Sequence, residues 1–335
     1  MRVLAILSVL VGLGIVIALI VMNGTAGIAA GLAAAGWGIL AVIAMHLPQV
    51  VMSSLAWRTL VISAQTPPRL TFFGLRWIRE GVNGLLPVAQ IGGHIVGARL
   101  LALAGVPLGT AGATVAVDLT MEMLSQAVFT LLGVGLLAAG AGDGGLSTRT
   151  TTGVLAALGM LVIVFILSQR FGLFRLLESG LLRMGRRQRW TGLEDVSGLH
   201  AAIVALYQSR RRLIRSWSWH FVAWLLGGLE VMVGLHVLGV AVGLRDATII
   251  ESLGQAFRAV GFVVPGGLGI QEGGVLLICS QLGIAPQVAI ELSLLRRIRE
   301  LALGGPGLLA WYWIERPRLM LFASVKKEPC RETAS

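Results

Sequence analysis

The hydropathy pattern of this chain alternates between long apolar stretches and short polar segments. Residues 3–22, for example, form a run of 20 without a charged side chain. About 20 apolar residues in a helix are enough to cross a hydrocarbon core of roughly 30 Å. The pattern therefore predicts an all-α polytopic membrane protein with about six full spans, at residues 3–22, 28–48, 108–140, 151–169, 217–241 and 288–314.

Two of these spans have features of their own. Residues 108–140 are too many for a perpendicular span, so we expect this helix to be tilted or broken near Asp118. Residues 3–22 follow Arg2 and could alternatively be a signal peptide. That apolar run is longer than the roughly 7–15 residues of a signal-peptide core, which favours a retained helix.

Two further stretches are interrupted in the same way. Residues 82–94 read V-N-G-L-L-P-V-A-Q-I-G-G-H, and residues 260–274 read V-G-F-V-V-P-G-G-L-G-I-Q-E-G-G. Proline disrupts a helix and glycine permits unusual backbone angles. Non-helical backbone at membrane depth is tolerated where it is buried in protein or lines a wet cavity. We therefore predict two re-entrant hairpins; the alternative is a pair of kinked helices that pack through small residues.

The two broken motifs occupy corresponding places in two halves of the chain. Each half has two spans, a broken segment and a third span, and an odd number of spans inverts the second half. Such inverted repeats are typical of secondary transporters. We predict a first repeat at 1–141 with its motif at 82–94, a second repeat at 142–315 with its motif at 260–274, and a tail at 316–335.

Composition and charge agree with a membrane protein. Only 13% of the residues are charged, whereas soluble domains average about a quarter. The net charge of +11 comes mainly from arginine, and the segment 170–215 holds ten arginines against three acids. This excess predicts a cytoplasmic loop at 170–215 and cytoplasmic termini, in a bacterial inner membrane. No soluble module with stacking aromatics is evident, so nucleic acid is not an expected partner.

Charged residues within the apolar segments are the candidate functional positions, because a charge in a bilayer is costly. We expect Arg76, Arg79, Arg296 and Arg299 to reach the membrane surface with their long side chains. The acids Asp118, Glu122 and Glu272 and the bases Arg258 and Arg297 are instead expected to pair across a pseudo-two-fold axis.

No pattern for a metal, a cofactor or catalysis is evident. The histidines have no partner at metal-ligand spacing, and the two cysteines form no C-x-x-C motif. Neither a P-loop nor a G-x-S-x-G motif occurs. We therefore expect no metal, no cofactor and no enzymatic activity.

Four stretches resemble a known family. They are N-G-L-L-P-V-A-Q-I-G-G at 83–93, D-L-T-M-E at 118–122, P-G-G-L-G-I-Q-E at 265–272 and R-R-I-R-E at 296–300. Together they resemble the flippase-like transmembrane domain of lysylphosphatidylglycerol synthases, and in detail its hopanoid-biosynthesis-associated (HpnL-like) subgroup. The chain departs from its relatives at His94, where they usually carry glutamate, and in the order of Asp118 and Glu122. About 20 residues follow the last predicted span, so we expect the translocating part of such a synthase without its transferase domain.

The resemblance implies a lipid flippase-like protein that moves, or hands on, a hopanoid, isoprenoid-linked or phospholipid substrate between leaflets. The alternatives are an accessory factor or enzyme acting on lipid head groups, and a scaffold for lipid-biosynthetic enzymes. The candidate translocation residues belong to the two motifs and the charged positions near them: Asn83, Pro87, Gln90, Gly92, Gly93, His94, Asp118, Glu122, Arg258, Pro265, Gly266, Gly267, Gly269, Glu272 and Arg297.

Overall fold

The computed structural model describes residues 13–62, 66–86, 92–140, 199–260 and 268–325, and this part of the chain is helical without strands. The prediction of an all-α polytopic membrane protein is confirmed. A first helix, Leu13–Met22, precedes α2. The others are α2 (Thr25–Ala35), α3 (Gly38–Leu60), α4 (Arg69–Leu85), α5 (Gly92–Leu103), α6 (Leu108–Gly140), α9 (Leu199–Gln208), α10 (Arg210–Val237), α11 (Leu244–Val260), α12 (Ile270–Gln281) and α13 (Pro286–Val325).

Among the described helices, α3, α6 and α10 are long and apolar enough to cross a membrane. Leu13–Met22 and α2 add a fourth candidate span if they count as one, although they meet at a bend of 96°. The predicted span 108–140 coincides with α6, and 217–241 overlaps α10. The predicted span 288–314 lies within α13. This helix contains the charged segment 296–300 and is not among the helices that are apolar enough to cross a membrane.

The structure corrects one predicted span and excludes one alternative for another. The span at 28–48 is interrupted, because α2 ends at Ala35 and Gly36 adopts a positive φ of 48° before α3 begins. For residues 108–140 we expected either a tilt or a break near Asp118, and the break does not occur, since α6 is one continuous helix of 33 residues. The predicted span 151–169 lies outside the described residues.

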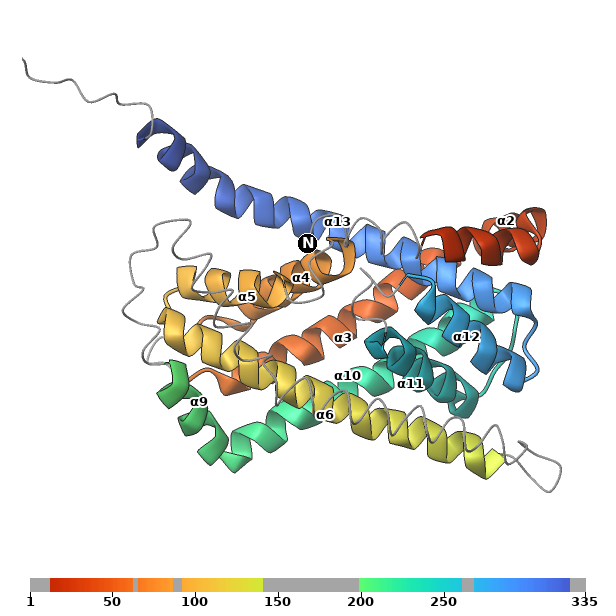
Figure 1. Cartoon of the computed structure of the whole chain (residues 1–335), viewed down its shortest axis with the longest axis horizontal. Coiled ribbons are helices and arrows are strands. Elements are labelled where there is room, and N and C mark those ends of the chain that lie inside the picture. The colour runs from red at the N-terminus through yellow and green to blue at the C-terminus, as the bar shows by residue number, and fades with distance from the viewer. Residues whose placement is uncertain (1–12, 63–65, 87–91, 141–198, 261–267, 326–335) are drawn as a thin grey trace, which may run out of the picture.

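The order of helices repeats along the chain. α3, α4, α5 and α6 are followed later by α10, α11, α12 and α13. The two inner pairs match in length: α4 and α11 have 17 residues each, and α5 and α12 have 12 each. The outer members are longer in the second set. Contacts correspond as well, because α4 packs on α13 while α11 packs on α6, and α3 packs on α10 in the middle (Figure 1). The inversion of the second half and its boundary at residue 141 stay predictions.

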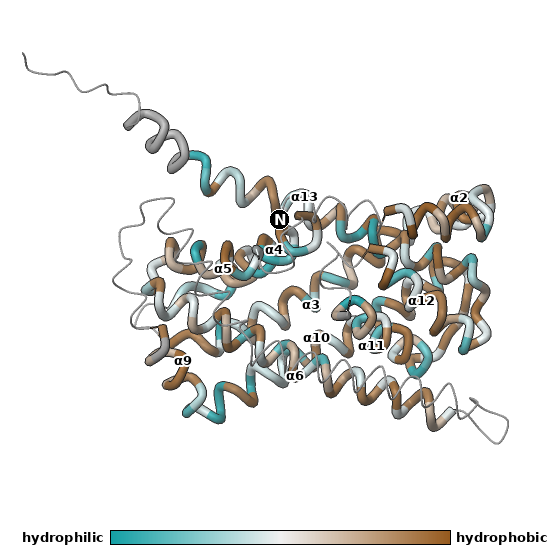
Figure 2. The backbone as a smooth tube through the Cα atoms, in the orientation of Figure 1, coloured by the Kyte–Doolittle hydropathy of each residue, from teal (hydrophilic) through white to brown (hydrophobic). Residues whose placement is uncertain are grey.

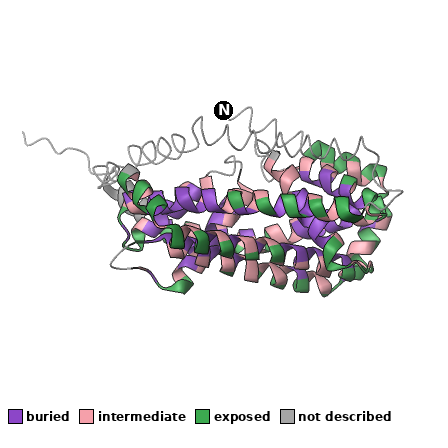
Figure 3. Cartoon of the chain, turned by 90° about the horizontal axis from the view of Figure 1, so that it is seen from below, coloured by how far each residue is buried: buried purple, intermediate pink, exposed green. Residues whose placement is uncertain are grey.

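The outer face of α6 is apolar. Leu124, Val128 and Leu131 lie on one side of the helix and are 39–53% exposed, whereas Ser125 and Phe129 are buried. Figure 2 shows the hydrophobic residues along this helix, and Figure 3 shows buried residues gathered on the inner faces of the bundle. An exposed apolar stripe along a helix suits contact with lipid tails.

Candidate functional site

The first broken motif lies between α4 and α5. Its middle, residues 87–91 with Pro87 and Gln90, is outside the described residues, but its two flanks are close together. The Gly93 backbone N–H donates to Asn83 Oδ1 at 2.8 Å. A Cβ atom at Gly93 would collide with the Arg79 carbonyl oxygen. Glycine at this position therefore lets the start of α5 lie directly against the end of α4.

The second broken motif lies between α11 and α12. Pro265, Gly266 and Gly267 fall outside the described residues. Gly269 has a φ of +81°, which favours glycine, and α12 begins at the next residue. Glu272 Oε2 accepts a hydrogen bond from the Gly269 N–H at 2.7 Å and so caps the helix. Both motifs thus place a new helix start after the break, and the re-entrant hairpins themselves stay predictions.

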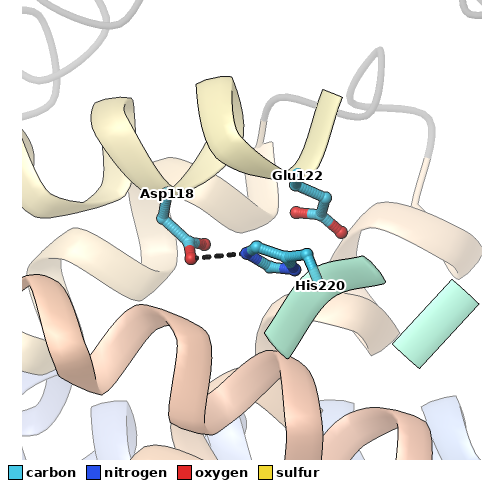
Figure 4. A group of neighbouring side chains, drawn as sticks. All are labelled: Asp118, Glu122 and His220. Carbon is cyan, nitrogen blue, oxygen red and sulfur yellow. Dashed lines mark hydrogen bonds and ion pairs between the residues drawn. The ribbon is translucent and has the colours of Figure 1, made fainter. Parts of the chain in front are cut away.

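Beside the first break lies a buried group of charges from three helices, which we name the first ion cluster: Arg76 and Arg79 of α4, Asp118 and Glu122 of α6, and His220 of α10. Arg76 binds Glu122 through both terminal nitrogens, at 3.1 and 2.5 Å. Arg79 Nη1 donates to Asp118 Oδ2 at 2.5 Å and Nη2 donates to Glu122 Oε2 at 3.1 Å. His220 Nε2 lies 2.9 Å from Asp118 Oδ1 (Figure 4). Every acid of this cluster is therefore shared between at least two cationic or polar donors.

The arginines of this cluster do not reach the membrane surface, contrary to prediction. Arg79 is 1% exposed and Arg76 is 6% exposed. The Arg79 guanidinium also stacks over the Trp57 ring at 5.4 Å from its centroid. Asp118 and Glu122 lie opposite these arginines on α6. A buried arginine that is paired with an acid costs less free energy than a buried arginine without a partner.

A second ion cluster lies beside the second break. It consists of six residues from α11, α12 and α13: Glu251, Arg258, Glu272, Arg296, Arg297 and Glu300. Arg297 donates to Glu272 Oε1 through Nε at 2.8 Å and Nη2 at 2.7 Å, and to Glu300 through Nη1 at 2.7 Å. Arg258 Nη1 donates to the other oxygen of Glu300 at 2.6 Å. Glu272 therefore joins the helix cap at the break to the charged segment of α13.

Arg296 is the least satisfied member of the second ion cluster. It pairs with Glu251, but its Nε and Nη1 are buried without a hydrogen-bond partner among the described residues. Arg296, Arg297, Glu272 and Glu300 line a cavity of about 10 Å³, which has room for about one water molecule. Buried N–H donors beside a small polar cavity can bind an acceptor once the cavity widens.

A chain of contacts connects the two halves of the molecule. His46 of α3 lies 3.0 Å from Glu230 of α10 and 3.5 Å from Glu80 of α4. Glu230 also pairs with Arg299 of α13. Arg299 is thus held within the bundle rather than at the surface, and Arg296 is also buried. The prediction that these two arginines reach the membrane surface is therefore wrong as well.

The predicted pairing across a pseudo-two-fold axis is wrong in its partners. Among the described residues, Asp118 and Glu122 pair with arginines of their own half, and so do Glu272, Arg258 and Arg297 in the second half. The charged contacts that do cross between the halves involve other residues: His220 with Asp118, His46 with Glu230, and Arg99 of α5 with Glu315 of α13 at 2.7 Å. Sequence spacing carried no signal for His220 or His46, since their partners are 102 and 184 residues away.

The carboxylate–histidine trio of Asp118, Glu122 and His220 has metal-like spacing, with ligand atoms all within 4.8 Å of one another. The same carboxylates, however, already receive hydrogen bonds from two guanidinium groups at 2.5–3.1 Å. A divalent cation would have to displace these positive charges. The donor set therefore fits an ion-paired network better than a metal site.

His94 lies in the first turn of α5, beside the first ion cluster. It is 6% exposed, and its Nδ1 atom has no hydrogen-bond partner in the described part of the chain. A glutamate at this place would add a third carboxylate close to the two arginines. Because His94 carries no carboxylate, the two guanidinium groups pair with Asp118, Glu122 and Glu80.

Comparison with known proteins gives one match. The family model described as "Lysylphosphatidylglycerol synthase TM region" matches residues 6–305, which is most of the chain and includes both broken motifs and both ion clusters. No curated protein and no solved structure matches the chain.

Proposed function

This chain belongs to the family of lysylphosphatidylglycerol synthase transmembrane regions, and from that premise we propose that it is a flippase-like protein which moves a lipid between leaflets. The family supports a membrane protein that acts on lipids. The finer parts of the proposal are a hopanoid, isoprenoid-linked or phospholipid substrate, a place in the bacterial inner membrane with both termini cytoplasmic, and contact with lipid-biosynthetic enzymes.

One observation carries the proposal: each broken helix pair lies beside a buried cluster of arginines and carboxylates. The hydrogen bond from Gly93 to Asn83 spans the first break, and Asn83 lies one helical turn after Arg79 on α4. Glu272 caps the helix after the second break and binds Arg297. If the helices separate at either break, the guanidinium groups of the adjoining ion cluster become accessible to a lipid head group.

The chemistry of these clusters suits an anionic head group. Guanidinium binds phosphate and carboxylate in the same bidentate geometry, so a phosphate can replace Glu122 on Arg76 or Glu272 on Arg297 without loss of hydrogen bonds. Such an exchange keeps the guanidinium group paired, and the displaced carboxylate retains its other donor, Arg79 for Glu122 and the Gly269 N–H for Glu272. A buried charge left without any partner would cost about 3–5 kcal/mol. The head group would pass through the protein while the tails stay among lipids beside the apolar face of α6.

The described residues of the second ion cluster are closely packed. A cavity of about 10 Å³ beside Glu272 is far too small for a lipid head group. Translocation therefore requires α12 to move away from α13, so that the bonds between Glu272 and Arg297 open on one side of the membrane. Alternating access about the two breaks is the motion that this architecture supports.

The test is leaflet-resolved translocation of labelled lipids in proteoliposomes that contain hopanoid, isoprenoid-phosphate and phospholipid probes. We compare the wild type with Glu272→Gln and Arg258→Ala, and with Arg245→Ala as a matched control on an exposed arginine. Protein-dependent flipping that is lost in the first two variants and kept in the control supports the proposal. Absence of flipping for every probe would refute it, and equal activity in all variants would remove the second ion cluster from the mechanism.

A second candidate is an accessory enzyme or factor that acts on lipid head groups. One contact favours it: Asp118 orients His220, as a carboxylate orients the imidazole of a general base. A deletion strain distinguishes the two candidates. An enzyme predicts loss of a lipid product, whereas a flippase predicts an unchanged product with an altered leaflet distribution.

A further inference from the structure

A basic cavity lies away from both ion clusters, where the end of α3 meets the start of α10. Its volume is about 570 Å³. Four arginines and two threonines line it: Arg58, Arg211, Arg212, Arg215, Thr59 and Thr66. Among the described residues that line it there are four positive charges and no acid.

Two of the arginines are held in place by backbone carbonyl groups. Arg212 Nη1 donates to the carbonyl oxygens of Thr59 at 3.1 Å and Val61 at 3.3 Å, at the end of α3. Arg58 Nε donates to the Pro67 carbonyl oxygen at 3.4 Å. These bonds fix two guanidinium groups at the wall and leave their remaining N–H groups for another acceptor.

The other two arginines lie on one face of α10. Arg211 and Arg215 are four residues apart, so their side chains are neighbours, and like charges at this spacing repel each other. Both are exposed, and neither forms an ion pair with an acid in the described ranges. An anion between them would relieve the repulsion and accept several charge-assisted hydrogen bonds.

The surroundings of the cavity point to a group at a membrane surface. Val61 and Ile62 add apolar lining, and Ile62 is 49% exposed. Ile214, between the two exposed arginines, is 64% exposed. The apolar span of α10 begins directly after this cationic turn. Cationic and apolar side chains side by side suit the level of lipid phosphates.

We propose that this arginine cavity binds a phosphate group, and that the phosphate is that of an anionic lipid head group. The site is separate from the ion clusters and does not depend on translocation. A protein that flips no lipid could still bind phosphate here, and a flippase could lack this site. A free phosphate compound shares the same chemistry and is distinguished by experiment.

The experiment measures binding to the full-length protein in a non-ionic detergent. The probes are dihexanoyl phosphatidylglycerol, dihexanoyl phosphatidylcholine and inorganic phosphate. The test variants are Arg211→Ala and Arg211→Ala/Arg215→Ala. The control for the single change is Arg210→Ala, which removes one positive charge just outside the lining. We expect roughly tenfold weaker phosphatidylglycerol binding for each lining arginine removed, so about 100-fold for the pair, and less than threefold for the control.

The outcomes separate the possibilities. Tight binding of phosphatidylglycerol with weak binding of inorganic phosphate supports a lipid head group. Equal binding of both supports the phosphate site and makes a soluble phosphate its ligand. Binding that survives in the double variant, or that falls equally in Arg210→Ala, overturns the proposal, as does failure of every probe to bind. Arg215→Glu serves as a second variant, since its exposed side chain can be changed without disturbing the core.

Discussion

The replacement Asp118→Asn tests the first ion cluster most directly. Asp118 is fully buried and accepts a hydrogen bond from Arg79 at 2.5 Å, with His220 at 2.9 Å on its other oxygen. Asparagine keeps the shape of the side chain and removes the charge. Arg79, which is 1% exposed, then loses its shortest partner inside the bundle.

The size of the effect follows from these contacts. Removing one partner of a buried ion pair typically costs about 3–5 kcal/mol. Arg79 keeps its 3.1 Å bond to Glu122, so we expect a loss near the lower end, about 3 kcal/mol. Arg79→Met should cost a similar amount. The double variant leaves no unpaired charge, and we expect a coupling free energy of about 2–3 kcal/mol between the two sites.

The assay is equilibrium unfolding in mixed micelles, followed by the fluorescence of the nine tryptophans. The four proteins of the double-mutant cycle are measured together with Asp246→Asn. Asp246 lies in the first turn of α11 and forms no ion pair in the described part of the chain, so its loss should cost less than about 1 kcal/mol.

Two results would refute the reasoning. If Asp118→Asn were as mild as Asp246→Asn, the buried contacts would contribute little to folding. If the two single changes were additive, with a coupling below about 0.5 kcal/mol, Arg79 and Asp118 would not act as a pair.

Three further predictions concern the breaks and the trio. Gly93→Val should reduce the yield of folded protein, because its side chain would collide with the Arg79 carbonyl oxygen, whereas Gly84→Val, with open space around it, should fold normally in the same size-exclusion assay. Glu272→Gln should lower the unfolding free energy by about 1–3 kcal/mol through its weakened bonds to Arg297, while glutamine still caps α12; no change in the unfolding curve would contradict this. Neither EDTA nor Zn²⁺ should shift the unfolding midpoint through the carboxylate–histidine trio, and a stabilisation by Zn²⁺ that vanishes in His220→Gln would show that a cation displaces the arginines.

The helices were predictable where one local signal dominates. The bounds of α6 follow from an apolar run between Pro107 and the glycines after Leu137, and the structure has the same limits. The break between α2 and α3 was missed because Gly36 and Trp37 stand in an apolar stretch without a charge or proline. There, one residue with a positive φ ends the helix, and hydropathy does not register it.

The sequence identified the charged residues that lie in apolar segments, because burying a charge there is costly. It did not predict which partners these residues bind. Arg76 and Arg79 look like surface residues, since a long cationic side chain near a helix end can reach water. The structure turns them inward because α6 places two carboxylates opposite α4. The same logic explains why Glu230 became a partner of both His46 and Arg299.

The sequence by itself determined the all-helical membrane fold, the positions of the two breaks and the presence of costly charges near them. These properties are local, because helix length, apolar runs, proline and glycine act within a few residues. Only the tertiary structure decided which charges meet, and it also assembled the arginine cavity from the end of α3 and the start of α10. Arg79 and Asp118 are 39 residues apart, and His220 and Asp118 are 102 apart. Such pairs depend on which helices become neighbours, and that choice results from packing of the whole bundle.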